Sequence, residues 1–301
     1  MSWTFKHSHG VSGHIYEMIE YYYILKTKFN VGLLICENIT PIKLREICSE
    51  KYDFTADELD DIINNTTFHL TPRVVRGKYL LLVDGNISRA FVSNGIKLIF
   101  KKIFCFRCSP RDTTWNLPYT NVILLQDQRV YNDRDSEHAI NYKKKILFDK
   151  YHIIESISTR TNMLYLTSNC RSMNLSDVHK CMSLHTNDQY IILTNSPDRY
   201  TSLTIDHNIS FPELPVENIF SKFDNYIYTP VSNSCDCFDC SPRFIAECHF
   251  YNKKVKYYDI TQEYISKDTG LFYRRLDIET DFKSLNLTDG DKIFDILSTH
   301  M

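Results

Sequence analysis

The chain has 301 residues, of which 43% are hydrophobic and 24% are charged, and its formal net charge is −2. This composition excludes a disordered chain and a globally basic nucleic-acid-binding protein, and the length suits two domains of roughly 150 residues each. The N-terminal segment lacks the apolar stretch of a signal peptide, and no apolar run approaches the length of a membrane span. We therefore predict a cytoplasmic protein without membrane insertion.

In the first half of the chain, short apolar runs alternate with helical patterns. A strand, a glycine-bearing loop and a helix are predicted at the start, followed by strands at 30–36, 78–85, 96–106 and 121–127. Continuous apolar runs of this length are typical of strands buried on both faces, and hence of a parallel sheet. Between the first two of these strands, Thr40 and Thr55 are predicted to cap helices, because each precedes a helical pattern.

The same alternation restarts after a polar segment near residue 158. Strands are predicted at 162–172, 189–197, 225–230 and 253–260, and an amphipathic stretch at 289–299 reads as a closing helix. The predicted fold class is therefore α/β, with two Rossmann-like domains at 1–158 and 159–301. Open parallel sheets bind ligands beyond the carboxyl ends of their strands, so two facing domains would place a site in the cleft between them.

The ten cysteines are scattered singly or in close pairs, which favours free thiols in a reducing compartment. The two C-x-x-C pairs are far apart in the chain and have no histidine at the spacing of a zinc finger. We predict no metal site, and a zinc-binding interaction protein is the least favoured alternative.

The segment "FDCSPRFIAECHFYNKKVKYYD", residues 238–259, holds the most specific pattern. Ser241 is a good N-cap and a proline follows it, so a helix is predicted from about residue 242 to 251, with its exposed amides available to an anion. Arg243 and Glu247, one turn apart, share a helix face. The plain alternative is a surface Arg/Glu pair on an ordinary capped helix.

This segment resembles the nucleotide-sugar site of GT-B glycosyltransferases, in which an acid, seven residues and a glutamate bracket a turn from loop to helix. Asp239 and Glu247 have that spacing. The resemblance implies that Asp239 contacts hydroxyls of the transferred sugar, that Ser241, Arg243 and the nearby amides hold the diphosphate, and that Glu247 holds the ribose. The chain departs from the pattern in having Asp for the usual first Glu, and cysteines in place of glycines.

The resemblance also assigns donor-side roles elsewhere. Gly10 and Gly13, in the loop after the first strand, would let the backbone approach the donor diphosphate, and His9 would donate to phosphate or move a proton. Asn169 and Arg171 follow the first strand of the second domain, where GT-B proteins often place a basic residue on the donor phosphates. A salt bridge near the linker is the alternative for Arg171.

Two acids compete for the role of catalytic base. Asp127 ends the strand at 121–127 and would remove the proton from the acceptor hydroxyl, and Asp84, at the end of the strand at 78–85, is the competing candidate. Either can instead cap a turn, and the sequence slightly favours Asp127.

The predicted reaction is sugar transfer from a UDP-sugar, with no other cofactor. In overall likeness the chain is similar to DNA-modifying sugar transferases of T-even-type bacteriophages, which implies 5-hydroxymethylcytosine in double-stranded DNA as acceptor, and arabinose as a candidate sugar. Basic residues of the first domain would then contact DNA: Lys101, Lys102, Arg111, Lys143 and Lys144. The alternatives are a cell-surface polysaccharide or lipopolysaccharide transferase and a non-catalytic nucleotide-binding module.

Overall fold

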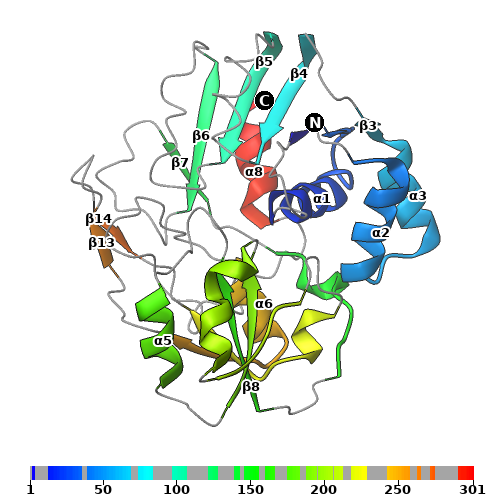
Figure 1. The fold of residues 1–301 in the computed structure, drawn as a ribbon. Coiled ribbons are helices and arrows are strands. Elements are labelled where there is room, and N and C mark those ends of the chain that lie inside the picture. Colours follow the sequence, from blue (N-terminus) through cyan, green and yellow to red (C-terminus); the bar gives the residue numbers. More distant parts are fainter. Residues whose placement is uncertain are drawn as a thin grey trace. The chain divides into compact units, whose positions relative to one another are not determined.

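The computed structural model divides the chain into two compact units, Met1–His152 with Lys283–Met301 (unit 1) and Ile153–Phe282 (unit 2). Figure 1 shows the helices and strands of both units. The residues that the structure describes are 2–3, 13–35, 39–68, 74–83, 97–106, 121–127, 139–142, 146–155, 160–166, 175–183, 188–194, 196–205, 207–212, 218–228, 243–257, 263–265, 272–274 and 291–301. Each unit is built on a parallel sheet, so the predicted α/β class is confirmed.

Unit 1 contains a seven-stranded sheet in the order β3-β2-β1-β4-β5-β6-β7, with every neighbouring pair parallel. Its strands are β1 (Ser2–Trp3), β2 (Leu33–Ile35), β3 (Thr66–Phe68), β4 (Val74–Leu82), β5 (Lys97–Phe106), β6 (Val122–Asp127) and β7 (Ala139–Tyr142). From the central β1, the chain winds first towards β3 and then, from β4 onwards, towards β7. The order therefore reverses between β1 and β4, and crevices form at such reversals in open α/β sheets.

The helices of unit 1 are α1 (Gly13–Leu25), α2 (Pro41–Lys51), α3 (Ala56–Asn64) and α8 (Asp291–His300), with a short 3-10 helix, η3 (Phe148–Lys150). The predicted caps are present: the Thr40 hydroxyl accepts from the backbone N–H of Lys43, and Thr55 forms a reciprocal capping box with Glu58. The helix predicted near the start of the chain is α1, and its Ile15, Met18 and Ile19 are fully buried.

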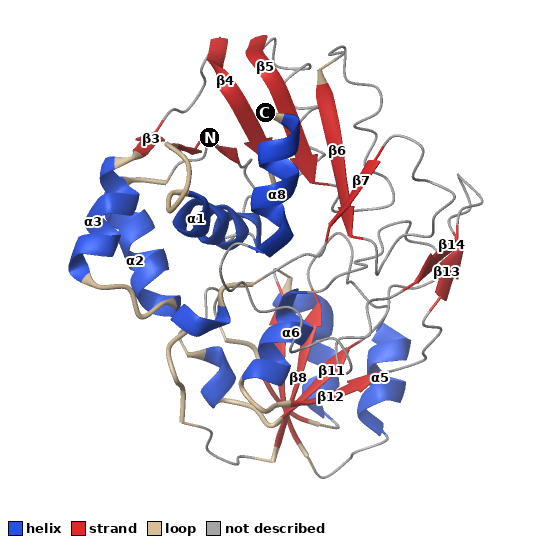
Figure 2. Ribbon diagram, turned by 180° about the vertical axis from the view of Figure 1, so that it is seen from behind, coloured by secondary structure: helices blue, strands red, loops and turns tan. Residues whose placement is uncertain are grey.

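Helix α8 corrects the predicted domain boundaries. The sequence assigned this closing helix to a domain at 159–301, but it groups with unit 1, and the first boundary falls after His152 instead of 158. The Phe294 ring lies 5.9 Å from the ring of Phe29, just beyond α1, and the ammonium of Lys28 lies 4.2 Å above the Phe294 ring. Figure 2 shows α8 beside α1. These contacts join residues distant in sequence, so local patterns could not reveal them.

Unit 2 repeats the winding of unit 1 in a five-stranded parallel sheet of order β10-β9-β8-β11-β12. Its elements are β8 (Thr161–Leu166), α5 (Leu175–Ser183), β9 (Gln189–Thr194), η4 (Pro197–Ile205), β10 (Asn208–Ser210), η5 (Ile219–Ser221), β11 (Asn225–Tyr228), α6 (Arg243–Phe250) and β12 (Lys254–Tyr257). A separate antiparallel pair joins β13 (Glu263–Ile265) to β14 (Phe272–Arg274). Across the described ranges of both units, no helix combines the length and apolarity needed to cross a bilayer.

Candidate functional site

The order of the unit 2 sheet reverses between β8 and β11, which are paired from Asn162 and Asn225 onward. The chain leaves β8 after Leu166 and β11 after Tyr228, so both departures occur from neighbouring strands at the carboxyl edge of the sheet. The segments that follow carry four of the predicted donor-binding residues. Asn169, Arg171, Asp239 and Ser241 themselves lie outside the described residues.

Helix α6 begins at Arg243, within one residue of the predicted start. Because the helix connects the end of β11 to the start of β12, its N-terminus faces the carboxyl edge of the sheet and its C-terminus the amino edge. Figure 2 shows α6 lying along the strands of unit 2. Ile245 and Cys248 are fully buried, which anchors the helix and fixes the direction in which its first amides point.

Arg243 and Glu247 form a buried ion pair on α6. The Arg243 Nε donates to Glu247 Oε1 at 2.8 Å, and the two side chains are 11% and 5% exposed. The sequence offered two interpretations of these residues, a surface pair or ligand contacts. The burial excludes a surface pair, and the ion pair gives each charge a compensating partner inside the protein.

The charge of Glu247 also acts on its neighbours along α6. Burial, with a smaller contribution from Glu247, raises the pKa of the Cys248 thiol well above its ordinary value. The same two causes, in the same order, raise the pKa of Tyr251. Cys248 is therefore a protonated core thiol and not an activated nucleophile.

In unit 1 the corresponding reversal lies between β1 and β4, where Trp3 is paired with Leu82. The segment after β1 carries His9 and Gly10, and Asp84 follows β4 by two residues; all three lie outside the described residues. Gly13 is the first residue of α1. The sequence thus selected residues from both segments that border the reversal.

Asp127 lies farther from that reversal. It is the last residue of β6, paired with Tyr142 of β7, and β6 is three strands away from β1 in the sheet. At a strand spacing of about 4.8 Å, this separation is about 14 Å, whereas β4 is the direct neighbour of β1. The strand that precedes Asp84 is therefore adjacent to β1, whereas the strand that ends at Asp127 is not.

Two of the predicted DNA-contacting lysines lie elsewhere. Lys101 and Lys102 lie in the middle of β5, five and four residues, respectively, before its carboxyl end at Phe106. Their ammonium groups bind the end of the α8 segment: Lys102 donates to the carbonyl of His300, and Lys101 donates to that of Met301 at 3.2 Å. The predicted contact of these two lysines with DNA stays a prediction. Arg111, Lys143 and Lys144 lie outside the described residues.

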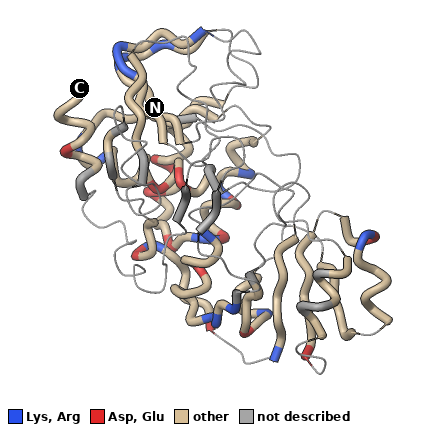
Figure 3. The backbone as a smooth tube through the Cα atoms, turned by 90° about the vertical axis from the view of Figure 1, so that its left-hand side faces the viewer, with Lys and Arg blue, Asp and Glu red and all other residues tan. Residues whose placement is uncertain are grey.

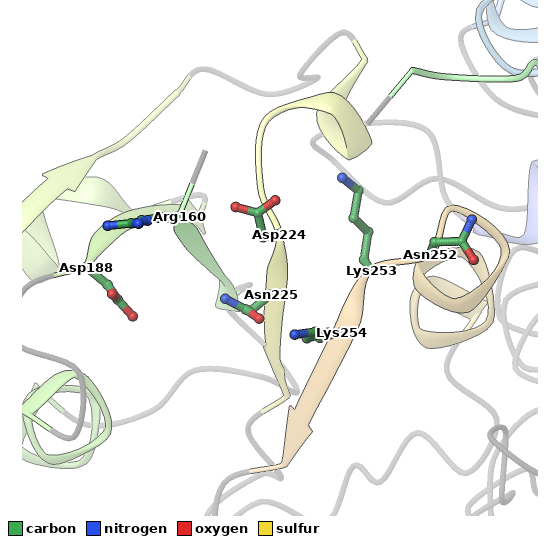
Figure 4. Close-up of a pocket in the computed structure, with 7 residues that line it drawn as sticks. All are labelled: Arg160, Asp188, Asp224, Asn225, Asn252, Lys253 and Lys254. Carbon is green, nitrogen blue, oxygen red and sulfur yellow. The ribbon is translucent and has the colours of Figure 1, made fainter. Parts of the chain in front are cut away.

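A depression of about 340 Å³ lies at the opposite, amino edge of the unit 2 sheet (Figure 4). Asn162 Nδ2 donates to Asp188 Oδ2 at 2.7 Å, and the backbone N–H of Thr161 donates to Asp224 Oδ2 at 3.3 Å. Burial lowers the pKa of Lys253, while Asp224 acts in the opposite direction. These contacts tie the beginnings of the strands together, so we assign the depression a structural role.

The sequence interpretation missed two buried acids, Glu17 and Glu20, which are 2% and 0% exposed on α1. Glu20 Oε1 accepts hydrogen bonds from the hydroxyls of Tyr52 at 2.9 Å and Tyr151 at 3.4 Å. The one sequence signal for their burial was the presence of acids inside a helix of mostly apolar residues. The tyrosine donors come from distant segments, and they show that Glu20 joins α1 to the segment that precedes unit 2.

Within the described ranges, no group of three or more His, Cys, Asp or Glu side chains is arranged to hold a metal ion. No protein-family model matches the chain, and no curated protein matches it either.

Proposed function

We propose that the protein is a nucleotide-sugar-dependent glycosyltransferase of GT-B type, which moves a sugar from a UDP-sugar to an acceptor hydroxyl. One observation carries the proposal: the acid-x7-Glu segment chosen from the sequence leads into a helix that starts at the carboxyl edge of a doubly wound sheet, beside its reversal point. Ligands of open α/β sheets bind at such places. In the GT-B arrangement, the two sheets would face each other across the donor and the acceptor.

On the donor side, α6 supplies both its N-terminus and the Arg243–Glu247 pair. A diphosphate at the first turn would be bound by backbone amides, by Arg171 and by Arg243, which forms strong charge-assisted hydrogen bonds with phosphate oxygens. When Arg243 turns to the diphosphate, Glu247 becomes available to the ribose hydroxyls. The buried pair thus holds the two groups in readiness, and the positive charges stabilise the departing nucleoside diphosphate.

On the acceptor side, Asp84 is the base we propose. In the sequence it comes two residues after β4, the strand next to β1, and His9 and Gly10 come after β1. A base must come within hydrogen-bond reach of the hydroxyl whose proton it removes. The strand β6, which ends at Asp127, lies about 14 Å from β1 across the sheet. From there, Asp127 would orient a large acceptor.

The acceptor we propose is 5-hydroxymethylcytosine in double-stranded DNA. A cytosine stacked inside the duplex cannot reach an active site, so the modified nucleotide would flip out of the DNA helix. Its hydroxymethyl group would then enter the site. The test incubates the full chain with UDP-glucose or UDP-arabinose and hydroxymethylated duplex DNA, followed by mass spectrometry of the nucleosides. A hexose or pentose adduct is the expected result.

Other outcomes separate the alternatives. Binding of a UDP-sugar with transfer only to surface glycans would keep the glycosyltransferase and overturn the DNA acceptor. Binding with no transfer to any acceptor would indicate a non-catalytic nucleotide-binding module. If no UDP-sugar binds, the proposal fails as a whole.

A further inference from the structure

The amino-terminal halves of β4 and β5 form a two-stranded ribbon, residues 74–80 and 97–102, which extends beyond the rest of the unit 1 sheet. Among the described strands, β1 pairs with β4 only at Leu81 and Leu82, and β6 pairs with β5 only from Ile103 onward. The ribbon residues pair with each other, from Val74 opposite Lys97 to Tyr79 opposite Lys102. At 3.3 Å per residue, the ribbon is about 20 Å long.

One face of this ribbon is basic and exposed. Paired and alternate residues of parallel strands share a face. The residues of this face are Val74, Arg76 and Lys78 on β4 and Lys97, Ile99 and Lys101 on β5, all exposed. Neither strand contains an acidic residue, although the chain as a whole has a net charge of −2. Figure 3 shows Lys and Arg, without Asp or Glu, along the described part of these strands.

On the opposite face, side-chain contacts hold the ribbon in place. The Phe100 ring lies across Gly77, so close that an added Cβ would meet the ring at 2.7 Å. The hydroxyl of Tyr79 donates to the carbonyl of Met301, at the end of the α8 segment. Lys101 also binds this carbonyl. The other basic residues of the exposed face are Arg76, Lys78 and Lys97. Among the described residues, none of these three takes part in a salt bridge.

We propose that the basic face of the ribbon binds duplex DNA, with its two strands lying in the major groove. The groove is about 12 Å wide and admits a two-stranded β-ribbon. The cationic side chains would contact phosphates, while Val74 and Ile99, which are 42% and 44% exposed, would contact apolar base edges such as the thymine methyl group. The surface lies at the amino side of the unit 1 sheet, opposite the carboxyl edge of that sheet. This inference does not require glycosyl transfer.

The test measures binding of a fluorescent 20-base-pair DNA duplex to the full chain at several salt concentrations, without a sugar donor. Phosphate contacts from Arg76, Lys78, Lys97 and Lys101, four in all, predict a slope of log K against log salt of about −3.6, since each contact contributes about −0.9. The triple variant Arg76→Gln/Lys78→Gln/Lys97→Gln should reduce the slope to about −0.9. At 0.1 M salt it should bind on the order of 100-fold more weakly.

The matched control removes one arginine and two lysines from exposed positions elsewhere: Lys28→Gln, Arg199→Gln and Lys222→Gln. Its affinity should stay within about threefold of the wild type, because it retains every ribbon contact. Equal losses in the two triple variants would overturn the proposal, since they would reflect net charge alone. Wild-type binding to vesicles of anionic lipid but not to the duplex would also overturn it. The ribbon variant should still bind a UDP-sugar as the wild type does, so a loss of DNA binding can be distinguished from a loss of the proposed catalytic function.

Discussion

The Arg243–Glu247 pair allows a quantitative test of how α6 is stabilised. Both side chains are nearly buried and their charges are joined at 2.8 Å, so removing one partner leaves the other charge desolvated. Breaking a buried pair in this way typically destabilises a protein by about 3–5 kcal/mol. We therefore expect Glu247→Met and Arg243→Met each to lower the free energy of unfolding of unit 2 by about 3 kcal/mol.

The double variant Arg243→Met/Glu247→Met should be within about 1 kcal/mol of the wild type, because apolar residues of similar volume commonly replace buried ion pairs without loss. The corresponding double-mutant cycle gives a coupling energy of several kcal/mol. Alkylation of Cys248 during urea titration, measured by mass spectrometry, provides a local assay, since its side chain is 0% exposed and lies next to Glu247.

Additive losses, with the double variant about 6 kcal/mol less stable, would contradict the pairing argument, because independent sites add. The double variant has a second use: it separates function from folding. If its stability is restored while UDP-sugar binding is lost, the loss reflects the missing donor contacts and not an unfolded helix.

Three further predictions concern other sites. Burial acts to raise the pKa of Glu58, but hydrogen bonds from Tyr23 and Lys150 outweigh it and hold the pKa at about 2. Its stabilising contribution, about 1 kcal/mol, is present above pH 5 and lost as the pH falls towards 2, so urea denaturation of Glu58→Gln should show a flatter acid limb than the wild type. A limb of equal slope would refute this assignment. Both ring nitrogens of His207 are buried without a hydrogen bond among the described residues, so His207→Phe should raise the free energy of unfolding by about 1 kcal/mol; a loss of that size would indicate a polar partner. Asp84→Asn should reduce transfer on the order of 100-fold or more, and Asp127→Asn only a few-fold, in the mass-spectrometric assay; the reverse order would restore Asp127 as the base.

The sequence predicted the elements whose signals are local. Continuous apolar runs gave β5 and β6 with boundaries within one residue of those observed, and Thr40 and Thr55 marked the beginnings of α2 and α3 through their caps. The start of α6 followed from Ser241 and its neighbouring proline in the same way. Each of these signals depends only on residues within a few positions.

Features that depend on distant contacts were missed or misplaced. β3 and β10 have three residues each, none of them buried, so they carry no hydrophobic pattern. The assignment of α8 to unit 1 depends on contacts such as that between Phe29 and Phe294. The hydrogen bond from Lys102 to the carbonyl of His300 joins residues 198 positions apart, so no local pattern could indicate it. Of the candidate site, the start of α6 was predictable, but the burial of Glu247 was not.

The most direct test of the central claim is amide hydrogen exchange, measured by mass spectrometry on the full chain with and without UDP-glucose or UDP-arabinose. If α6 begins at a donor site, exchange in the peptide containing Arg243 and Glu247 should slow when a UDP-sugar is present, because the ligand occupies the first amides of the helix. The stable double variant should show no such protection. Binding that slows exchange in other peptides but leaves α6 unchanged would contradict the account.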